Sequence, residues 1–125
     1  MSLESLTRYC LSKKGTKEEY PFGDDILVIK VSSKIFAFLS ERNHQPNISL
    51  KCDPFIADNL RQQYPSVTPG YHLNKSHWNT IILDGSIPEP ELYSMIDHSY
   101  ELVFKKLTKS EKDAVLQINT SKSFK

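Results

Sequence analysis

Hydrophobic residues recur every three or four positions in three stretches of the chain, a spacing typical of the buried side of an α-helix. The pattern predicts helices over residues 2–14, 53–64 and 86–107. The last stretch is the longest and the most regular, with apolar residues at intervals of three and four from Leu92 to Leu107. Each helix is therefore expected to bury one side against the rest of the protein.

The ends of these stretches carry residues that start or stop helices. Asp53 precedes Pro54, which combines an N-cap acceptor with a proline that the first helical turn tolerates. Gly15 follows the first stretch and can adopt the left-handed conformation that ends a helix. Ser86 and Glu89 have the spacing of a capping box, so the third helix is expected to begin there.

Short runs of β-branched and aromatic residues lie between the helical stretches and predict strands. Five strands are expected, at residues 26–31, 34–39, 48–52, 71–73 and 78–83. The first two would form one hairpin and the last two another, with residues 74–77 at the second turn. Alternation along the second strand would place Phe36 and Phe38 on the same face of the sheet.

The predicted order is helix, three strands, helix, two strands and helix, which indicates an α+β fold with an antiparallel sheet covered by helices. Residues 16–25 and 41–47 are expected to be loops, the second because it is polar and contains Pro46. No linker or shift in composition divides the chain, so we expect a single domain over residues 1–107. Residues 108–125 would form a basic, polar C-terminal extension.

The charge of the chain is nearly balanced but unevenly distributed. Its 125 residues include 16 Lys+Arg and 15 Asp+Glu, a formal net charge of +1. Residues 105–125 hold six lysines against two acids, a balance of +4, which leaves 10 basic and 13 acidic residues, or −3, in residues 1–104. This composition excludes the strongly basic class of nucleic-acid-binding proteins. Any surface that binds DNA must be local or belong to the C-terminal end.

Targeting and redox features point to one compartment. No apolar run approaches the roughly 20 residues that cross a bilayer, and the first residues lack the order of a signal peptide. The two cysteines, Cys10 and Cys52, are too few for a disulfide framework, and both fall on predicted apolar faces. We therefore expect a cytoplasmic protein without a membrane partner.

Residues that carry catalytic chemistry are sparse. The four glycines do not form a phosphate-binding loop, and neither cysteine has an adjacent base. His72 and His77 lack a third ligand nearby, so they make a poor metal site. We expect a protein that is not an enzyme, with no catalytic residue, no metal and no cofactor.

Residues 70–79 concentrate side chains that contact ligands: two aromatic rings, two histidines, a lysine and two asparagines. Aromatic rings and histidine can stack on bases, while lysine and asparagine can contact phosphates or base edges. The structural alternative is that Tyr71 and Trp78 pack onto the sheet or beneath the last predicted helix. Lys75 and His77 lie near the predicted turn and are better placed for exposed contacts.

Several short motifs occur in an order and at a spacing that resemble one protein family. They include Cys10-Leu-Ser-Lys-Lys-Gly15, Tyr20-Pro-Phe-Gly23, Leu50-Lys-Cys-Asp-Pro54, Pro69-Gly-Tyr-His72 and Asn74-Lys-Ser-His-Trp-Asn79. Along nearly its whole length the sequence is similar to the MmcQ/YjbR-like family of small bacterial proteins. The resemblance implies a CyaY-like, or frataxin-like, α+β arrangement with a double-wing motif, and it implies DNA binding.

Two functions of different classes follow from these observations. In the first, the protein binds double-stranded DNA through two hairpin wings, residues 26–39 and 71–83. The side chains expected to contact phosphate are Lys34, Arg61, Lys75 and His77. In the second, it is a module that binds a protein or a small ligand. The face expected to bind that partner comprises Tyr71, His72, His77, Trp78 and Asn79.

Overall fold

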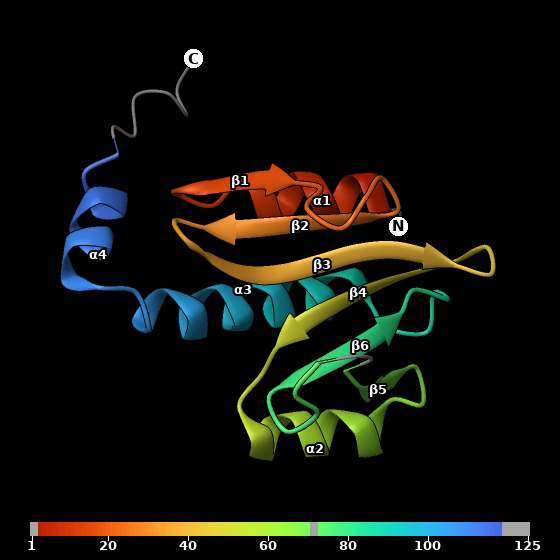
Figure 1. The fold of residues 1–125 in the computed structure, drawn as a ribbon. Helices are drawn as coiled ribbons and strands as arrows, with labels where there is room; N and C mark the ends of the chain where they lie inside the picture. The colour runs from red at the N-terminus through yellow and green to blue at the C-terminus, as the bar shows by residue number, and fades with distance from the viewer. Residues whose placement is uncertain (1–2, 71–72, 119–125) are drawn as a thin grey trace.

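The computed structural model describes residues 3–70 and 73–118 of the chain. They form one antiparallel sheet of six strands in the order β1-β2-β3-β4-β6-β5, together with four helices (Figure 1). The helices are α1 (Leu3–Leu11), α2 (Pro54–Gln63), α3 (Glu89–Lys105) and α4 (Lys109–Leu116). The strands are β1 (Thr16–Glu19), β2 (Ile26–Val31), β3 (Lys34–Arg42), β4 (Gln45–Lys51), β5 (Val67–Pro69) and β6 (Trp78–Ile82). The predicted α+β class is confirmed.

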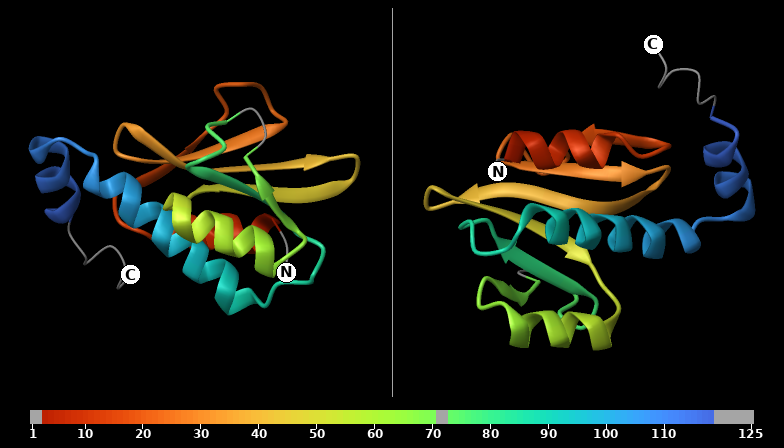
Figure 2. Two further views of the ribbon diagram at one scale, coloured as in Figure 1. Left: turned by 90° about the horizontal axis from the view of Figure 1, so that it is seen from below. Right: turned by 180° about the vertical axis from the view of Figure 1, so that it is seen from behind.

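One face of the sheet is covered and the other is open. Helices α1, α2 and α3 lie on the same side of the sheet, and α4 stands at one end (Figure 2). The hydrophobic core fills the space between the sheet and these helices, and it includes Leu6, Cys10, Ile29, Val31, Phe36, Leu39, Ile48, Leu50, Ile81, Leu92, Ile96 and Val103. The apolar stripes that predicted α1 and α3 are buried as expected, whereas on α2 Phe55 and Ile56 are 75% and 41% exposed and Ala57 is the buried residue.

A bulge changes the alternation predicted for β3. The register with β2 shifts between Ile29 and Lys30, which leaves Phe36 without an opposite residue. As a result Phe36 and Ala37 are both buried in the core, while Phe38 is only half-buried. The prediction that Phe36 and Phe38 share a face is wrong, because the extra residue of a bulge resets the alternation of side chains.

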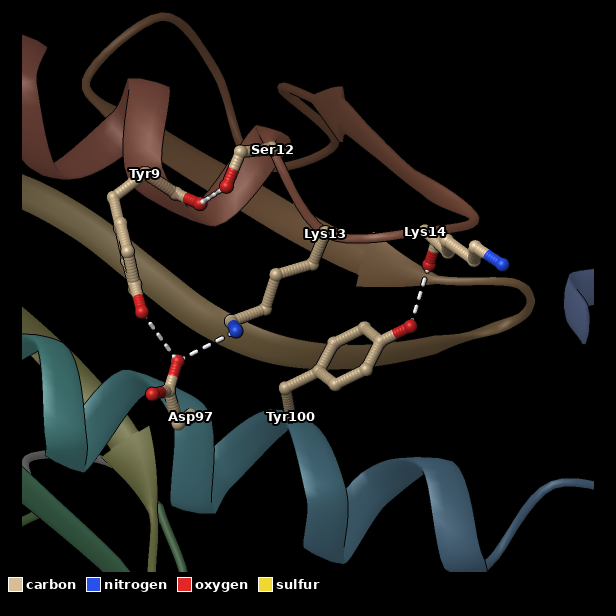
Figure 3. Close-up of polar contacts among 6 residues, drawn as sticks. All are labelled: Tyr9, Ser12, Lys13, Lys14, Asp97 and Tyr100. Carbon is tan, nitrogen blue, oxygen red and sulfur yellow. Dashed lines mark hydrogen bonds and ion pairs between the residues drawn. The ribbon is translucent and has the colours of Figure 1, made fainter. Parts of the chain in front are cut away.

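A cluster of polar contacts joins α1 and the residues after it to α3 (Figure 3). The Tyr9 hydroxyl donates to Asp97 Oδ1 at 2.7 Å, and Lys13 Nζ lies 2.5 Å from the same oxygen. The Tyr100 hydroxyl donates to the backbone carbonyl of Lys14 at 2.6 Å. The hydrogen bond to Asp97 raises the pKa of Tyr9 to about 12. These contacts join α1 and the two lysines after it to α3.

Strand β1 lies in the segment 16–25 that was expected to be a loop. Its residues are Thr-Lys-Glu-Glu, so they carry no apolar alternation, and the strand is recognisable only by its pairing with β2. Glu19 also forms an ion pair with Lys30 of β2, with 3.0 Å between Lys30 Nζ and Glu19 Oε1. The loop prediction is wrong for these four residues because an outer strand needs no hydrophobic face.

The segment 41–47, also expected to be a loop, contains the hairpin that connects β3 and β4. Its turn is Asn43-His44, and both residues have positive φ, 51° and 64°. Positive φ at both central residues is the geometry of a two-residue turn that matches the twist of paired strands. Pro46 lies opposite Glu41 in the register. Opposite residues of an antiparallel ladder alternate between hydrogen-bonded and non-hydrogen-bonded pairs, and at this position the strand residue donates no N–H to β3, so proline fits.

The second hairpin joins β5 and β6 rather than residues 71–73 and 78–83. Tyr71 and His72 lie outside the described residues, and Leu73 is not in a strand. Besides β4, strand β6 pairs with β5, Val67–Pro69. The predicted hairpin is wrong because the outer strand beside β6 ends at Pro69, and a proline at the end of an outer strand does not interrupt the ladder.

The starts of two helices test the predicted caps. The Asp53 carboxylate accepts two backbone N–H groups of the first turn of α2, as predicted. The capping box expected at Ser86 and Glu89 is wrong, because α3 begins after Pro88 without a side-chain cap. The Ser86 hydroxyl instead donates to Asp84 Oδ1 at 2.6 Å. None of the described helices is both long and apolar enough to span a membrane.

Helix α4 falls within residues 108–125, the predicted extension. Val115 is buried against the rest of the core, and a side chain at Gly15 would approach it within 2.8 Å. The Ser32 hydroxyl, in the β2–β3 turn, donates to Glu111 at 2.9 Å. Helix α4 therefore packs against the end of the sheet at which β3 begins (Figure 1).

Candidate functional site

The face of the sheet that the helices leave open contains a groove of about 920 Å³, which we call the open-face groove. Strands β2, β3, β4 and β6 form its base, and the β1–β2 connection and Leu73 lie at its sides. The lining residues used below are Phe22, Asp25, Phe38, Ser40, Glu41, Asn47, Ser49 and Thr80. The groove is on the side opposite α1, α2 and α3.

Uncharged polar side chains form the floor of the open-face groove. Strand alternation places them there because Ile48 and Leu50, the neighbours of Asn47 and Ser49, face the core. The Ser40 hydroxyl donates to Asn47 Oδ1 at 3.2 Å. The hydroxyls of Ser49 and Thr80 are 2.8 Å apart across β4 and β6. The floor thus presents a row of hydroxyl and amide groups that are preorganised by their own hydrogen bonds.

Aromatic rings border this floor. Phe38 packs edge-on against Trp78, with ring centroids 5.4 Å apart and an interplanar angle of 65°. Phe22, from the β1–β2 connection, lines the groove and is 63% exposed. The position of Trp78 matches the structural alternative that its sequence context allowed, in which the ring packs against the sheet. Flat apolar walls above a polar floor are typical of sites that bind small organic molecules.

Two carboxylates stand at one end of the groove. The last register pair of β2 and β3 is Ile26 with Ser40, and Asp25 and Glu41 are the residues next to that pair in the chain. Both are exposed and both line the groove. Among the described side chains that line the groove, none is basic. The electrostatic character of its described lining is therefore negative.

Arg61, a predicted phosphate contact, is engaged within the protein. Its Nε donates to Asn79 Oδ1 at 2.7 Å, and its terminal nitrogen donates to the backbone carbonyls of Lys75 and Trp78. Asn79 itself is 2% exposed and lies on the helix-covered side, where its amide reaches Ala57 of α2. The structure therefore brings Arg61, Lys75, Trp78 and Asn79 together as a connection between α2 and β6.

The remaining predicted contacts are exposed. Lys34 begins β3 beside the turn that α4 contacts, whereas Lys75 and His77 lie in the loop before β6. The two segments are at the same end of the sheet, where β3 and β6 begin, but strand β4 separates them. Tyr71 and His72 lie outside the described residues.

The described residues give little support for a reactive cysteine or a metal-binding site. Burial raises the pKa of Cys10 to about 12 and that of Cys52 to about 11, so both thiols are protonated at neutral pH. Both are core side chains, as their positions on apolar faces predicted. Across residues 3–70 and 73–118, no three His, Cys, Asp or Glu side chains are grouped so as to hold a metal ion.

Comparison with known proteins places the chain in a family. The YjbR family model matches residues 11–102. The chain belongs to the YjbR family. It is 36% identical over 118 residues to YjbR of Escherichia coli K12, which covers 94% of this chain and 100% of that protein. It is also 40% identical over 96 residues to YbdF of Escherichia coli O157:H7, covering 77% of this chain and 79% of that protein. The family resemblance carried by the motifs is confirmed.

Solved structures of similar proteins agree with the fold. The Deinococcus radiodurans protein DR2400 is 38% identical, with a TM-score of 0.84 over 91% of this chain and 87% of that one. A Pseudomonas syringae protein is 29% identical, with a TM-score of 0.73 over 82% of this chain and 99% of that one. These two proteins therefore share the overall fold of this chain.

Sequence reasoning did not identify the floor of the open-face groove. The signal was present in β4, where Asn47 and Ser49 alternate with Ile48 and Leu50. The predicted loop over 41–47 hid this alternation, because it removed Asn47 from the strand. Hydroxyl and amide side chains are also common in ordinary surface positions, so the residue types alone do not indicate a site.

Proposed function

We propose that this member of the YjbR family is a cytoplasmic binding protein rather than an enzyme, and that it holds a small organic ligand in the open-face groove. The groove itself is the observation that carries the proposal. Its volume of about 920 Å³ falls within the roughly 300–1,000 Å³ of typical small-molecule sites. A polar floor with aromatic walls suits a ligand that has a hydrogen-bonding edge and apolar faces.

The floor supplies both kinds of hydrogen-bonding group. Asn47 Oδ1 already accepts from Ser40, so the amide hydrogens of Asn47 are the donors that this side chain can offer to a ligand. Ser49 and Thr80 share one hydrogen bond, and hydroxyl oxygens can accept another. Phe38 and Phe22 can contact the flat faces of a ring.

A fragment screen followed by amide chemical shifts tests this proposal. We expect ligands with Kd of about 1 mM or tighter, which corresponds to about 4 kcal/mol of binding free energy. Their shifts should map to β3, β4 and β6 and not to α1. The variant Asn47→Leu should weaken binding by about tenfold or more, because it removes the donor and fills the floor.

Thr7→Val is the matched control for the loss of a polar group. Thr7 is on α1, and its hydroxyl donates only to the backbone carbonyl of Leu3, at 2.7 Å. This variant should bind as the wild type does. A screen without any binder, or binders whose shifts map to α1 and α3, would contradict the proposal.

DNA binding is a second candidate, and the exposure of Lys34, Lys75 and His77 at one end of the sheet favours it. In this alternative the β2–β3 turn and the loop before β6 act as the two wings. Nonspecific binding should then reach a Kd of about 100 µM or tighter and weaken steeply with salt. Lys34→Glu and Lys75→Glu should each reduce the salt dependence by about one unit of slope. No binding of duplex DNA at about 50 mM salt would rule this candidate out.

A further inference from the structure

A second cavity lies between α2 and α3, on the face of the sheet opposite the open-face groove, and we call it the α2–α3 cavity. Its volume is about 230 Å³, and strands β4 and β6 line it together with the two helices. Strand β6 shows how the two sites are separated. Ile81 lines the cavity, and its neighbour Thr80 lines the groove, because successive side chains of a strand point to opposite faces.

The apolar side chains around this cavity leave space between them. Leu50, Ile81 and Met95 line it and are buried. Ile56 of α2 also lines it but is 41% exposed, and Ala57 is the buried residue of this helix. Protein interiors hold few voids larger than a water molecule. A larger apolar space beside a helix with exposed apolar side chains therefore indicates a ligand site rather than ordinary packing.

The size and the chemistry of the lining favour an aromatic ligand. An apolar cavity of about 150 Å³ can hold benzene. The α2–α3 cavity, at about 230 Å³, can therefore accommodate one ring with a short substituent. Met95 and Cys52 contribute sulfur atoms to the lining, and sulfur makes favourable contacts with aromatic rings.

One hydrogen-bond donor at this cavity is not used within the protein. His98 lines the cavity, and its Nε2 accepts the backbone N–H of Asp53 at 3.2 Å, so the imidazole proton is on Nδ1. This Nδ1 makes no hydrogen bond within the described residues. It is in contact with solvent, since no buried side-chain nitrogen or oxygen of those residues lacks a partner. The Asn79 amide also lines the cavity, but Arg61 and Ala57 already engage it.

We infer that the α2–α3 cavity binds a small aromatic molecule with one hydrogen-bond acceptor, which receives the Nδ1–H of His98. The ring lies against the apolar floor and Met95, and the acceptor is directed toward α3. This site is separate from the open-face groove, so the inference does not rest on the proposed function.

Benzonitrile and phenylacetylene provide the test, because they have nearly the same shape and differ in whether the terminal atom accepts a hydrogen bond. We expect both to bind with a Kd of about 1 mM or tighter, with amide shifts on α2 and α3. His98→Leu should weaken benzonitrile about fivefold to tenfold, the equivalent of one hydrogen bond, and phenylacetylene less than about twofold. Phenylacetylene thus controls for any effect of this variant on the shape of the cavity.

Ser94→Trp tests the location in a second way. Ser94 lines the cavity at an exposed position of α3, so an indole there should block the entrance and weaken both compounds by about tenfold or more. The matched control is Ser110→Trp, at an exposed position of α4, which should bind both compounds as the wild type does. Asn47→Leu, in the open-face groove, should also leave their binding unchanged.

The contrary results are distinct from a failure of the proposed function. No binding of either compound at about 3 mM would overturn the inference. Equal weakening of the two compounds by His98→Leu would overturn it as well, because the hydrogen bond would then be absent. If His98→Leu does not fold, the comparison of Ser94→Trp with Ser110→Trp decides. Shifts on β2 and β3 that Asn47→Leu abolishes would place the compounds in the open-face groove, which overturns this inference and supports the proposed function.

Discussion

Both faces of this sheet hold buried side chains, but of different kinds: apolar ones under the helices and polar ones on the open side. Strand β4 shows the contrast within four residues. Ile48 and Leu50 are 0% and 2% exposed beneath the helices, and Asn47 and Ser49 are each 6% exposed on the open side. Low exposure therefore does not identify the core of this protein. What distinguishes the faces is whether the neighbouring groups are apolar or hydrogen-bonded.

This contrast has energetic consequences. On the helix-covered face a side chain contributes through the apolar area and the contacts that it buries. On the open face a buried polar group contributes little net stability, because its hydrogen bonds replace those made with water. Substitutions of equally buried residues should therefore have unequal effects on folding.

The largest effect is expected from a core ring. Phe36→Ala should reduce the free energy of unfolding by about 3–5 kcal/mol, since it leaves a cavity beside Tyr100. The two rings are in edge-to-face contact with centroids 5.3 Å apart. Urea denaturation measures the change. Phe22→Ala, on the open face, is the matched control and should cost less than about 1 kcal/mol. Similar losses for the two variants would remove the distinction between the faces.

A polar residue on the core side comes next. The Ser99 hydroxyl is fully buried, donates to the carbonyl of Phe36 at 2.6 Å and accepts from the N–H of Lys51 at 2.9 Å. Ser99→Ala leaves both backbone groups without this partner and should cost about 1–3 kcal/mol in unfolding experiments. Ser94→Ala, at an exposed position of the same helix, should cost almost nothing. An equally small loss for Ser99→Ala would mean that water replaces the hydroxyl.

The hydroxyl pair on the open face should show a smaller effect. Ser49→Ala and Thr80→Val should each cost about 1 kcal/mol, and the double variant should cost less than their sum, because removing both partners leaves no single group unpaired. A double-mutant cycle in urea measures this coupling. Strict additivity would show that the 2.8 Å contact contributes nothing to folding.

The smallest effect belongs to neither face but to the contact between α4 and the β2–β3 turn. Hydrogen bonds from Ser33, the Thr108 backbone and Ser32 lower the pKa of Glu111 from 4.5 to about 2. Because the pKa of Glu111 is lower in the folded state than in the unfolded state, this contact stabilises the protein at pH values above 4.5. The stabilisation is lost as the pH falls from 4.5 to about 2. The amide signals of α4 should follow this titration.

Glu111→Gln is the control for that titration. The amide can accept some of the same hydrogen bonds but has no proton to gain in this range. The signals of α4 in this variant should therefore be nearly independent of pH over the same interval. A titration that persists in the variant would assign the effect to another carboxylate.

The helix-covered face is the part that sequence reasoning predicts well. Leu6 and Cys10 share one side of α1, and Asp53 marks the start of α2, because helical spacing and capping are local properties. The same reasoning missed β1, whose charged residues pair with β2 without burying an apolar side. It also misplaced Phe36, since a bulge depends on the neighbouring strand and not on the local sequence.

The candidate site was harder to predict for a related reason. Its floor is assembled from three strands, and one of them begins in a segment that a proline and a polar run marked as a loop. Arg61 illustrates the opposite difficulty. It was predicted to contact phosphate, but its side chain forms hydrogen bonds within the protein, to Asn79 and to the backbone carbonyl of Trp78. Family motifs identified the fold, but they do not indicate which side chains remain available to a ligand.

The two outermost strands of the sheet affect how the protein behaves in concentrated solution. Unpaired backbone groups at a sheet edge can template pairing with another chain, which leads to aggregation. Strand β1 carries Lys17 and Glu18, both exposed, and β5 is three residues long and ends at Pro69. Charge on one edge, and brevity with a proline on the other, disfavour the addition of a seventh strand. The short, polar character that concealed these strands in the sequence thus protects the sheet from fibril-like growth.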